Sequence, residues 1–315
     1  MPSLMRELLG KAEKGGRSLI KWLQEKKLLT AKMKCPVCRH NMQIKRTNST
    51  KDGYRWRCRR HCHRDTSRSI RSGSVFEGSH LELSVWLKLI HNLAQGLRRR
   101  HVDLIEDGVC GSSTSITRVY DRLRDLCITA VQRLQRKKKM RIGGRHAFVV
   151  LDESKFRHKR KYNRGRLGRT WRRKRSWVFG MLEVRGERRR PVLKLVKRRS
   201  RRHLERIVEK YVKPGSQVIS DCWRAYHNLQ QRGYIHFQVN HQRFFVHPQT
   251  GVHTQHIERA WRTYKETVYR YRGNLSEMSL RQTLRFIEWD YWLGRQHRHG
   301  QIGRILHDIK KVYKV

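Results

Sequence analysis

Hydrophobic residues in the first 140 positions recur at a helical spacing. Residues 1–34 predict a short helical lead-in. Residues 77–140 predict a helix that ends near Gly96, a short helix over His101–Glu106 and a third helix capped by Ser112–Thr114. Gly108 and Gly111 supply the turn between the last two helices. This order fits a helix-turn-helix DNA-binding region, although any helical bundle gives a similar pattern.

The second half of the chain alternates between short apolar runs and amphipathic stretches. Strands are predicted at residues 146–152, 177–184, 191–196, 216–220 and 235–239, and helices at 201–212, 222–232 and 254–269. Three strands in succession, followed by alternating helix and strand, predict an α/β domain with a mixed sheet and an RNase-H-like order. The basic run 136–139 and the glycines that follow it mark a boundary, so we place the catalytic domain at 145–272 and further helices at 273–315.

Cysteines cluster between the lead-in and the helical region. Cys35 and Cys38 form a CxxC pair, and Cys58 and Cys62 follow after a segment with Asp52-Gly53 at its centre, which is typical of a hairpin turn. Two such cysteine pairs supply the four ligands of a structural Zn²⁺ site. We therefore predict a zinc module over residues 35–76. Cys62 is the first choice for the fourth ligand, with His61 or His63 as alternatives.

The formal net charge of +50 indicates a polyanionic partner, because such a field binds phosphate backbones regardless of sequence. No run of 18 apolar residues exists to span a membrane, and no secretory signal precedes the cysteines, which favours metal binding in a reducing compartment. Basic runs such as residues 136–139 fit either nuclear import signals or DNA contacts. We expect a nuclear protein that binds double-stranded DNA and no membrane.

Three acidic residues stand out against this basic background. Asp152 and Asp221 each end a predicted strand, and Glu258 lies in a predicted helix. Two strand-end carboxylates and a third on a later helix suit a site for two Mg²⁺ or Mn²⁺ ions in phosphoryl chemistry. Glu153 follows Asp152 directly and is expected on the opposite face of the strand, so we rank it below Asp152.

A strongly basic segment follows the first acid. Twelve of the 21 residues from Lys155 to Arg175 are Lys or Arg, with aromatic residues between them. Such a segment suits a loop that grips phosphates and stacks on a base, although a basic loop without that role has the same composition. The candidate DNA contacts are Lys155, Lys159, Arg160, Lys161, Arg164, Arg166, Trp171, Arg172 and Arg173.

The chain resembles the Merlin-type DDE transposases of eukaryotic cut-and-paste DNA transposons, which are related to bacterial insertion-sequence transposases. The resemblance rests on the motifs at residues 152–156, 161–166, 177–180, 219–226, 239–241 and 253–261. The 36 residues between Asp221 and Glu258 agree with that family's spacing. Two departures are the lack of a glycine after Phe156 and the bulky His256 in place of a small polar residue.

The resemblance implies an RNase-H-like catalytic domain that cleaves at terminal inverted repeats and transfers the freed 3′-hydroxyl into target DNA. Asp152, Asp221 and Glu258 carry over as metal ligands, and the candidate neighbours are Asn240, His253, Trp261 and Lys265. Joining two transposon ends implies a homodimer or a larger assembly on DNA. Two other readings stay open: a transposase-derived DNA-binding regulator without cleavage, and a metal-dependent DNA nuclease without strand transfer.

Overall fold

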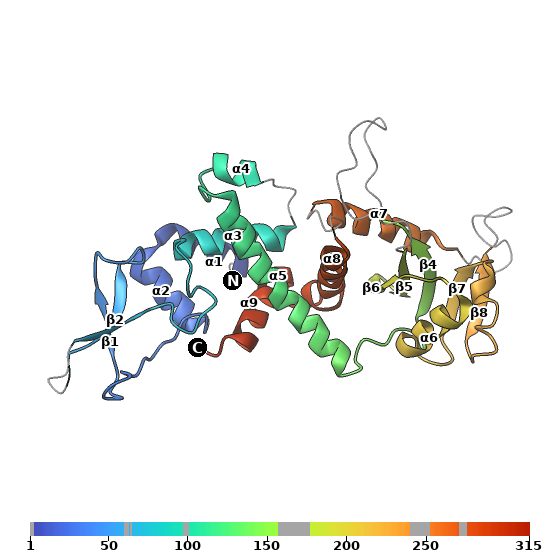
Figure 1. The fold of residues 1–315 in the computed structure, drawn as a ribbon, viewed down its shortest axis with the longest axis horizontal. Coiled ribbons are helices and arrows are strands. Elements are labelled where there is room, and N and C mark those ends of the chain that lie inside the picture. Colours follow the sequence, from blue (N-terminus) through green and yellow to red (C-terminus); the bar gives the residue numbers. More distant parts are fainter. Residues whose placement is uncertain are drawn as a thin grey trace. The chain divides into compact units, whose positions relative to one another are not determined.

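The computed structural model describes residues 3–59, 63, 65–96, 101–156, 177–239, 253–270 and 276–315. The chain forms two compact units, one of Met1–Cys127 with Gly294–Val315 and the other of Ile128–Leu293 (Figure 1). The described helices include none that is long and apolar enough to cross a membrane.

The first unit combines helices with a small antiparallel sheet. Its helices are α1 (Leu4–Lys14), α2 (Gly16–Glu25), α3 (Leu83–Gln95), α4 (His101–Glu106), the first part of α5 (Ser113–Arg136) and α9 (Gly300–Val312). The helix α3 packs against α1 and α9, and its Trp86, Leu89 and Ile90 are buried. The three helices predicted over residues 77–140 are therefore present.

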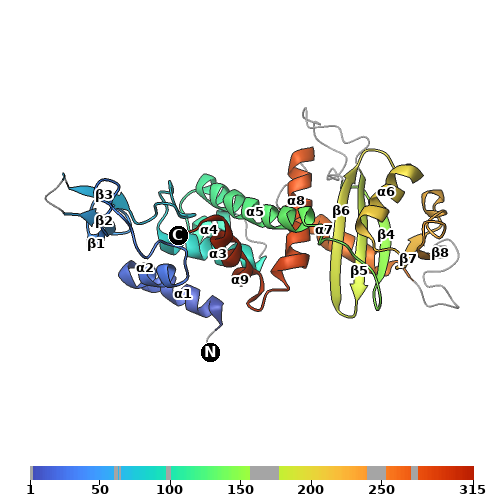
Figure 2. The ribbon, with the colours of Figure 1, turned by 90° about the horizontal axis from the view of Figure 1, so that it is seen from below.

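The small sheet has the order β1-β2-β3 (Figure 2), with β1 (Gln43–Arg46), β2 (Tyr54–Cys58) and β3 (Thr66–Ser69). Arg46 pairs with Tyr54, which confirms the predicted hairpin around Asp52-Gly53. The guanidinium of Arg71 donates to both carboxylate oxygens of Asp52, at 2.5 and 2.6 Å, and both side chains are buried. This two-point ion pair fixes the hairpin turn against the chain that leaves β3.

The second unit is built around a five-stranded sheet of order β6-β5-β4-β7-β8, which confirms the predicted mixed α/β architecture. Its strands are β4 (Phe148–Ser154), β5 (Trp177–Arg185), β6 (Arg188–Val196), β7 (Gln217–Asp221) and β8 (Ile235–Val239). The strand β5 runs antiparallel to β4 and β6, whereas β4, β7 and β8 are parallel. The last residues of β4 and β7 therefore lie at one end of the sheet, together with the start of β5 and the end of β6.

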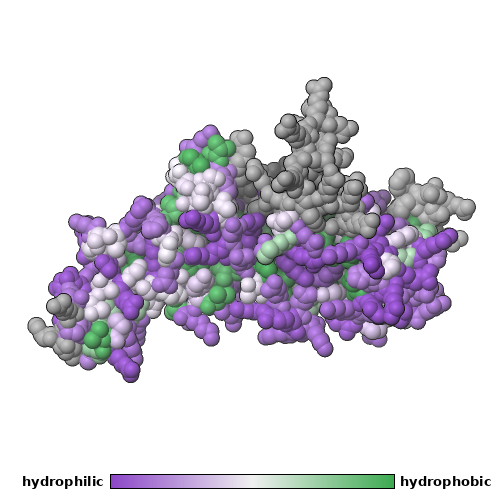
Figure 3. All heavy atoms as spheres, in the orientation of Figure 1, coloured by the Kyte–Doolittle hydropathy of each residue, from purple (hydrophilic) through white to green (hydrophobic). Residues whose placement is uncertain are grey.

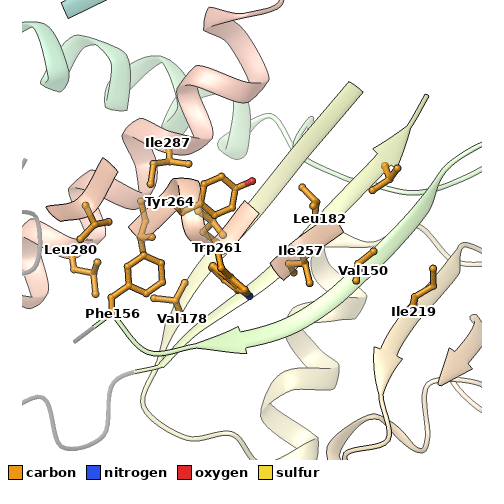
Figure 4. Packing of buried hydrophobic residues seen from close by; sticks show 14 of the residues in the cluster. Val150, Phe156, Val178, Leu182, Ile219, Ile257, Trp261, Tyr264, Leu280 and Ile287 are labelled. Atoms are coloured by element: carbon orange, nitrogen blue, oxygen red, sulfur yellow. The ribbon is translucent and has the colours of Figure 1, made fainter. Parts of the chain in front are cut away.

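Helices cover both faces of this sheet (Figure 1). The helices α7 (Gln255–Arg270) and α8 (Glu277–Trp289) pack on one face through a buried cluster that includes Val150, Ile257 and Trp261 (Figure 4). The helix α6 (Arg201–Tyr211) and the 3₁₀ turn η2 (Arg224–Tyr226) lie on the other. Because side chains alternate along a strand, Asp152 shares the α7 face with Val150, and Glu153 takes the opposite face.

A buried carboxylate on α8 forms a hydrogen bond with the edge strand β6. Glu288 of α8 has no exposed surface; it accepts a hydrogen bond from the Leu193 backbone N–H at 2.8 Å and pairs with Arg285 and Lys194. A short π-helix, η3 (Asp290–Gly294), follows α8, and Trp292 within it donates to the Pro191 carbonyl at 2.7 Å. These contacts use edge-strand polar groups that could otherwise pair with another chain.

The helix predicted over residues 222–232 is wrong. Only the three residues of η2 are helical there. Most of the hydrogen bonds that follow are of the tighter i to i−3 kind, as in Leu229 N–H to the Tyr226 carbonyl at 3.1 Å. The physical reason lies in tertiary contacts. The Trp223 N–H donates a hydrogen bond to the Asp221 carboxylate, and the Tyr226 hydroxyl donates one to Glu153. Because these contacts hold the segment against the sheet, it does not form a regular helix.

Candidate active site

Asp152 lies near the end of β4, where a side chain distant in the sequence holds its carboxylate. The indole N–H of Trp261, on α7, donates to Asp152 Oδ2 at 2.7 Å. Trp261 is itself packed edge-on between Phe156 and Tyr264, with ring centroids 5.8 and 5.9 Å away. The indole is therefore held firmly enough to set the orientation of the carboxylate.

The space for this indole exists because Gly180 faces Asp152 across the β4–β5 ladder. A Cβ atom at Gly180 would stand 2.5 Å from two carbons of the Trp261 ring. No real side chain tolerates such an approach, so Gly180 is needed for close packing and not for an unusual backbone conformation. This glycine was part of a sequence motif, but its role follows only from the strand register.

Asp221 and Glu258, the two other predicted metal ligands, lie close enough to Asp152 for their charges to act on it. Asp221 ends β7 and accepts the Trp223 N–H at 3.1 Å, while Glu258 lies in the first turn of α7 and accepts the Thr254 hydroxyl at 2.8 Å. Burial raises the pKa of Asp152 to about 6, and the negative charges of Asp221 and Glu258 add to this rise, against the opposing hydrogen bond from Trp261. A buried carboxylate that two other carboxylates repel is suited to binding a cation.

Glu153 occupies the opposite face, as its place in the strand predicted. It accepts a hydrogen bond from the buried Tyr226 hydroxyl and lies 4.0 Å from the Arg199 guanidinium. Burial raises the pKa of Glu153 to about 7, with Asp152 and Asp221 adding to the rise and Tyr226 opposing it. Glu153 thus belongs to the buried support behind the three carboxylates.

Cations and indoles stack beside this support. The Arg199 guanidinium lies 3.7 Å from the ring centre of Trp177 and 4.8 Å from that of Trp223, and the Lys155 ammonium lies 4.2 Å from Trp177. Of the predicted DNA contacts, Lys155 is therefore next to the site. The others, Lys159, Arg160, Lys161, Arg164, Arg166, Trp171, Arg172 and Arg173, lie outside the described residues. Sequence reasoning missed Arg199, because nothing distinguishes it within the basic run 197–202.

The other predicted neighbours are distributed unevenly. Trp261 contacts Asp152 directly, and the Lys265 ammonium lies 5.9 Å from the Phe156 ring. The His253 ring is tilted against the His256 ring, with centroids 4.8 Å apart, and the His256 ring lies 5.7 Å from that of Phe148 at the start of β4. Asn240 lies outside the described residues.

A second candidate metal site lies in the first unit. One ligand atom from each of Cys35, Cys38, Cys58 and His63 falls within 4.8 Å of the others. The pKa of the Cys38 thiol is lowered to about 5, chiefly by a hydrogen bond from the His40 backbone and also by bonds from His63 and Cys58. Three thiols and an imidazole at this separation match a tetrahedral zinc site.

The fourth position of this cluster is taken by His63, one of the two alternatives to Cys62. Its Nε2 atom lies 3.2 Å from the Cys38 sulfur and 3.5 Å from the Cys35 and Cys58 sulfurs. Cys62 and His61 lie outside the described residues. The short segment after Cys58 places an imidazole among the thiols, which the CxxC pattern alone did not decide.

Comparison with known proteins places the carboxylates within a recognised domain. Residues 141–289 match the sequence family of the ISXO2-like transposase domain, and this range contains Asp152, Asp221 and Glu258. No curated protein and no solved structure matches the chain. The family match supports a transposase of the DDE type, a class of DNA-binding, metal-dependent nucleases and transferases, for the domain at residues 141–289.

Proposed function

We propose that this chain is a DDE transposase that cleaves phosphodiester bonds at transposon ends and transfers the freed 3′-hydroxyl into target DNA. The observation that carries the proposal is the hydrogen bond from Trp261 to Asp152, together with the proximity of Asp221 and Glu258, whose charges act on the Asp152 carboxylate. One structural glutamate is ordinary on a protein surface. Here two further carboxylates lie close enough to the buried Asp152 to disfavour its charged form, and a bound cation would offset that repulsion.

In this proposal the carboxylates hold two Mg²⁺ or Mn²⁺ ions, which prefer hard oxygen ligands and retain several waters. When bound, such ions orient the attacking oxygen and stabilise the leaving oxygen of an in-line displacement. The protein's own donors hold the ligands ready. Trp261, the Trp223 backbone and Thr254 each bond one oxygen of Asp152, Asp221 and Glu258 respectively, which fixes the side chains before any substrate arrives.

Two finer assignments rest on topology and motifs. The sheet has the order β6-β5-β4-β7-β8, in which β5 is antiparallel to β4 and β6, and β7 and β8 are parallel to β4. This topology supports an RNase-H-like core. The motifs around Asp152, Asp221 and Glu258 support the Merlin type. In this proposal the cysteine–histidine module holds Zn²⁺ and, with helices α3–α5, recognises the terminal repeats. Two or more chains then act together on DNA in the nucleus.

The test compares cleavage and joining of DNA carrying the repeats that flank this gene, in Mg²⁺ and in Mn²⁺. Wild type is expected to give joined products, whereas Asp152→Asn, Asp221→Asn and Glu258→Gln are each expected to lose at least about a thousandfold in rate, because each removes a metal ligand. All three variants should still bind the DNA. A carboxylate variant that cleaves at the wild-type rate would remove that residue from the site.

The same assay separates the two other readings. Cleavage that depends on the three carboxylates but yields no joined product would indicate a nuclease. Tight DNA binding without cleavage by wild type in either metal, at several salt concentrations, would indicate a DNA-binding regulator.

A further inference from the structure

An open hollow of about 590 Å³ lies in the second unit beside the edge strand β6. It is formed by the end of β6, the connection from β6 to α6, the first turns of α6 and one residue of α8. The residues that line it are Leu195, Lys197, Arg198, Ser200, Arg202, His203, Arg206 and Arg281. Five of these eight are Lys or Arg, and the visible surface of the molecule is largely hydrophilic (Figure 3).

The positive charge of this hollow has little local compensation among the described residues. No lining residue is acidic, and the nearby carboxylate that acts on the lining is Glu277, which pairs with Arg281 at 2.6 Å. Lys197 also helps to lower the pKa of Glu277, behind the larger effect of Arg281. One carboxylate against five cations leaves a strong net positive charge in a concave site, which is where field lines concentrate.

The start of α6 adds to the positive charge of the hollow. Ser200, the residue before the helix, makes no side-chain hydrogen bond to its first turn, and that turn contains no acidic residue. The N-terminal N–H groups of this 11-residue helix therefore point their partial positive charge towards the lining. Together the side chains and the helix form a receptor for an anion with several oxygen atoms.

The hollow lies at the same end of the sheet as the carboxylates. Val196, the last residue of β6, pairs with Trp177, the first residue of β5, and Val178 pairs with Ser154 just beyond Asp152. Arg199 connects the hollow with the buried support of the carboxylates. It lies 4.0 Å from Glu153 and directly follows Arg198, which lines the hollow. Lys197 is two positions before Arg199, and two residues of chain span at most about 7 Å. The two residues are therefore no farther apart than a few phosphates along a DNA strand.

We propose that this hollow, defined by Lys197, Arg198, Arg202, Arg206 and Arg281, binds backbone phosphates of the DNA that flanks the scissile bond. The site deepens the proposed function and rests on it for the identity of the nucleic acid. Arg199, held between two indoles, continues the cationic path from the hollow towards the carboxylates. The contacts fix the position of the duplex and carry no sequence information.

The first test is lysine acetylation of the full-length protein, read by mass spectrometry with and without duplex DNA. Lys197 in the hollow is compared with Lys213, an exposed lysine just before β7 and thus at the opposite end of the same sheet. Lys197 is expected to be protected severalfold by DNA and to regain reactivity at high salt, whereas Lys213 keeps its rate. Equal protection of the two lysines, or none at Lys197, would overturn the proposal.

The second test is the salt dependence of duplex binding by Arg202→Gln/Arg206→Gln, against the charge-matched control Arg145→Gln/Lys213→Gln at the far end of the sheet. The exchange preserves helix propensity. Loss of two phosphate contacts is expected to reduce the slope of log K against log salt by roughly 1.8, whereas the control keeps the wild-type slope. Equal slopes for the two variants would refute the site.

Neither measurement requires catalysis, so the two proposals fail separately. Selective protection of Lys197 in a wild-type protein that cannot cleave would leave the phosphate site standing and remove the transposase function. Carboxylate-dependent cleavage together with an unprotected Lys197 would support the transposase function and remove the phosphate site.

Discussion

At the level of single side chains, the contact between Trp261 and Asp152 organises the candidate active site. The two residues are 109 positions apart, and their 2.7 Å hydrogen bond depends on the absence of a side chain at Gly180. A donor that orients a metal-binding carboxylate acts as a positioning group, and such partners matter nearly as much as the ligands.

Trp261→Phe tests this positioning role. An aromatic ring remains at this position, although it is smaller than the indole, and Asp152 loses its donor. We therefore expect the Mn²⁺ concentration for half-maximal cleavage to rise roughly 10- to 100-fold. Gly180→Ala should act in the same direction by displacing the indole. Tyr264→Phe, one turn away on the same helix, is the control and should leave the metal dependence unchanged. A Trp261→Phe variant with the wild-type metal dependence would show that the bond is only structural.

Asp152→Asn is expected to stabilise the metal-free protein. Burial and two neighbouring carboxylates raise the pKa of Asp152 to about 6, so the folded state holds this proton more tightly than the unfolded chain. Stability is therefore lost as the pH rises from about 4 through about 6. The asparagine removes this cost, and we expect a gain of roughly 1–3 kcal/mol at pH 8 that disappears towards pH 4. Urea denaturation in chelator at the two pH values measures it, and an equal gain at both would contradict the electrostatic cause.

At the level of secondary structure elements, the edge strand β6 is held by a buried charge cluster. Glu288 accepts the Leu193 N–H and faces both Lys194 and Arg285, and burial lowers the pKa of Lys194 to about 8 despite the attraction of Glu288. Breaking a buried pair leaves uncompensated charge, which costs far more than the pair itself contributes.

Glu288→Ala is accordingly expected to destabilise the second unit by roughly 3–5 kcal/mol, and Glu288→Gln by less, because the amide oxygen can still accept from Leu193. Thermal denaturation measures both. Glu277→Gln removes a more exposed carboxylate from the same helix and should change stability by only about 0–1 kcal/mol. A similar loss for Glu277→Gln and Glu288→Ala would show that helix α8 as a whole, and not the buried cluster, sets the effect.

At the level of the whole molecule, the two compact units depend on different sources of stability. The second unit has an extensive apolar cluster between its sheet and α7–α8, whereas the small sheet of the first unit has short strands with mostly exposed or half-buried residues. A small sheet of this kind usually needs a metal to remain folded. We therefore expect zinc to control the folding of the small sheet and to leave the second unit unaffected.

Cys35→Ser and His63→Ala are each expected to abolish zinc binding, measured as metal per chain by mass spectrometry, and to impair recognition of the DNA ends. Cys62→Ser should keep its zinc, because the cluster already has four ligand atoms with His63. The thermal transition of the second unit should persist in all three. Zinc lost from Cys62→Ser and retained by His63→Ala would assign the fourth ligand to Cys62.

Local patterns were sufficient for much of this protein. Alternating and helical periodicities predicted the sheet and most helices, because each element buries one face at its own repeat. The strands that carry Asp152 and Asp221 and the helix that carries Glu258 were predicted correctly, whereas the metal-binding role of these residues stays a prediction. The CxxC pair predicted the cysteine–histidine cluster. The helix at 222–232 failed because Asp221 and Glu153 draw its residues into tertiary hydrogen bonds that outweigh local preference.

Strand register and long-range packing decided the remainder. Only the pairing of β4 with β5 sets Gly180 opposite Asp152 and so admits the Trp261 indole. Only the tertiary structure groups His63 with the thiols of Cys35, Cys38 and Cys58. The roles of Arg199 and of the cationic hollow were also not visible in the basic run. Each depends on neighbouring side chains that are distant in the sequence. Contacts between distant segments depend on how the elements pack, and no periodicity along the chain encodes that arrangement.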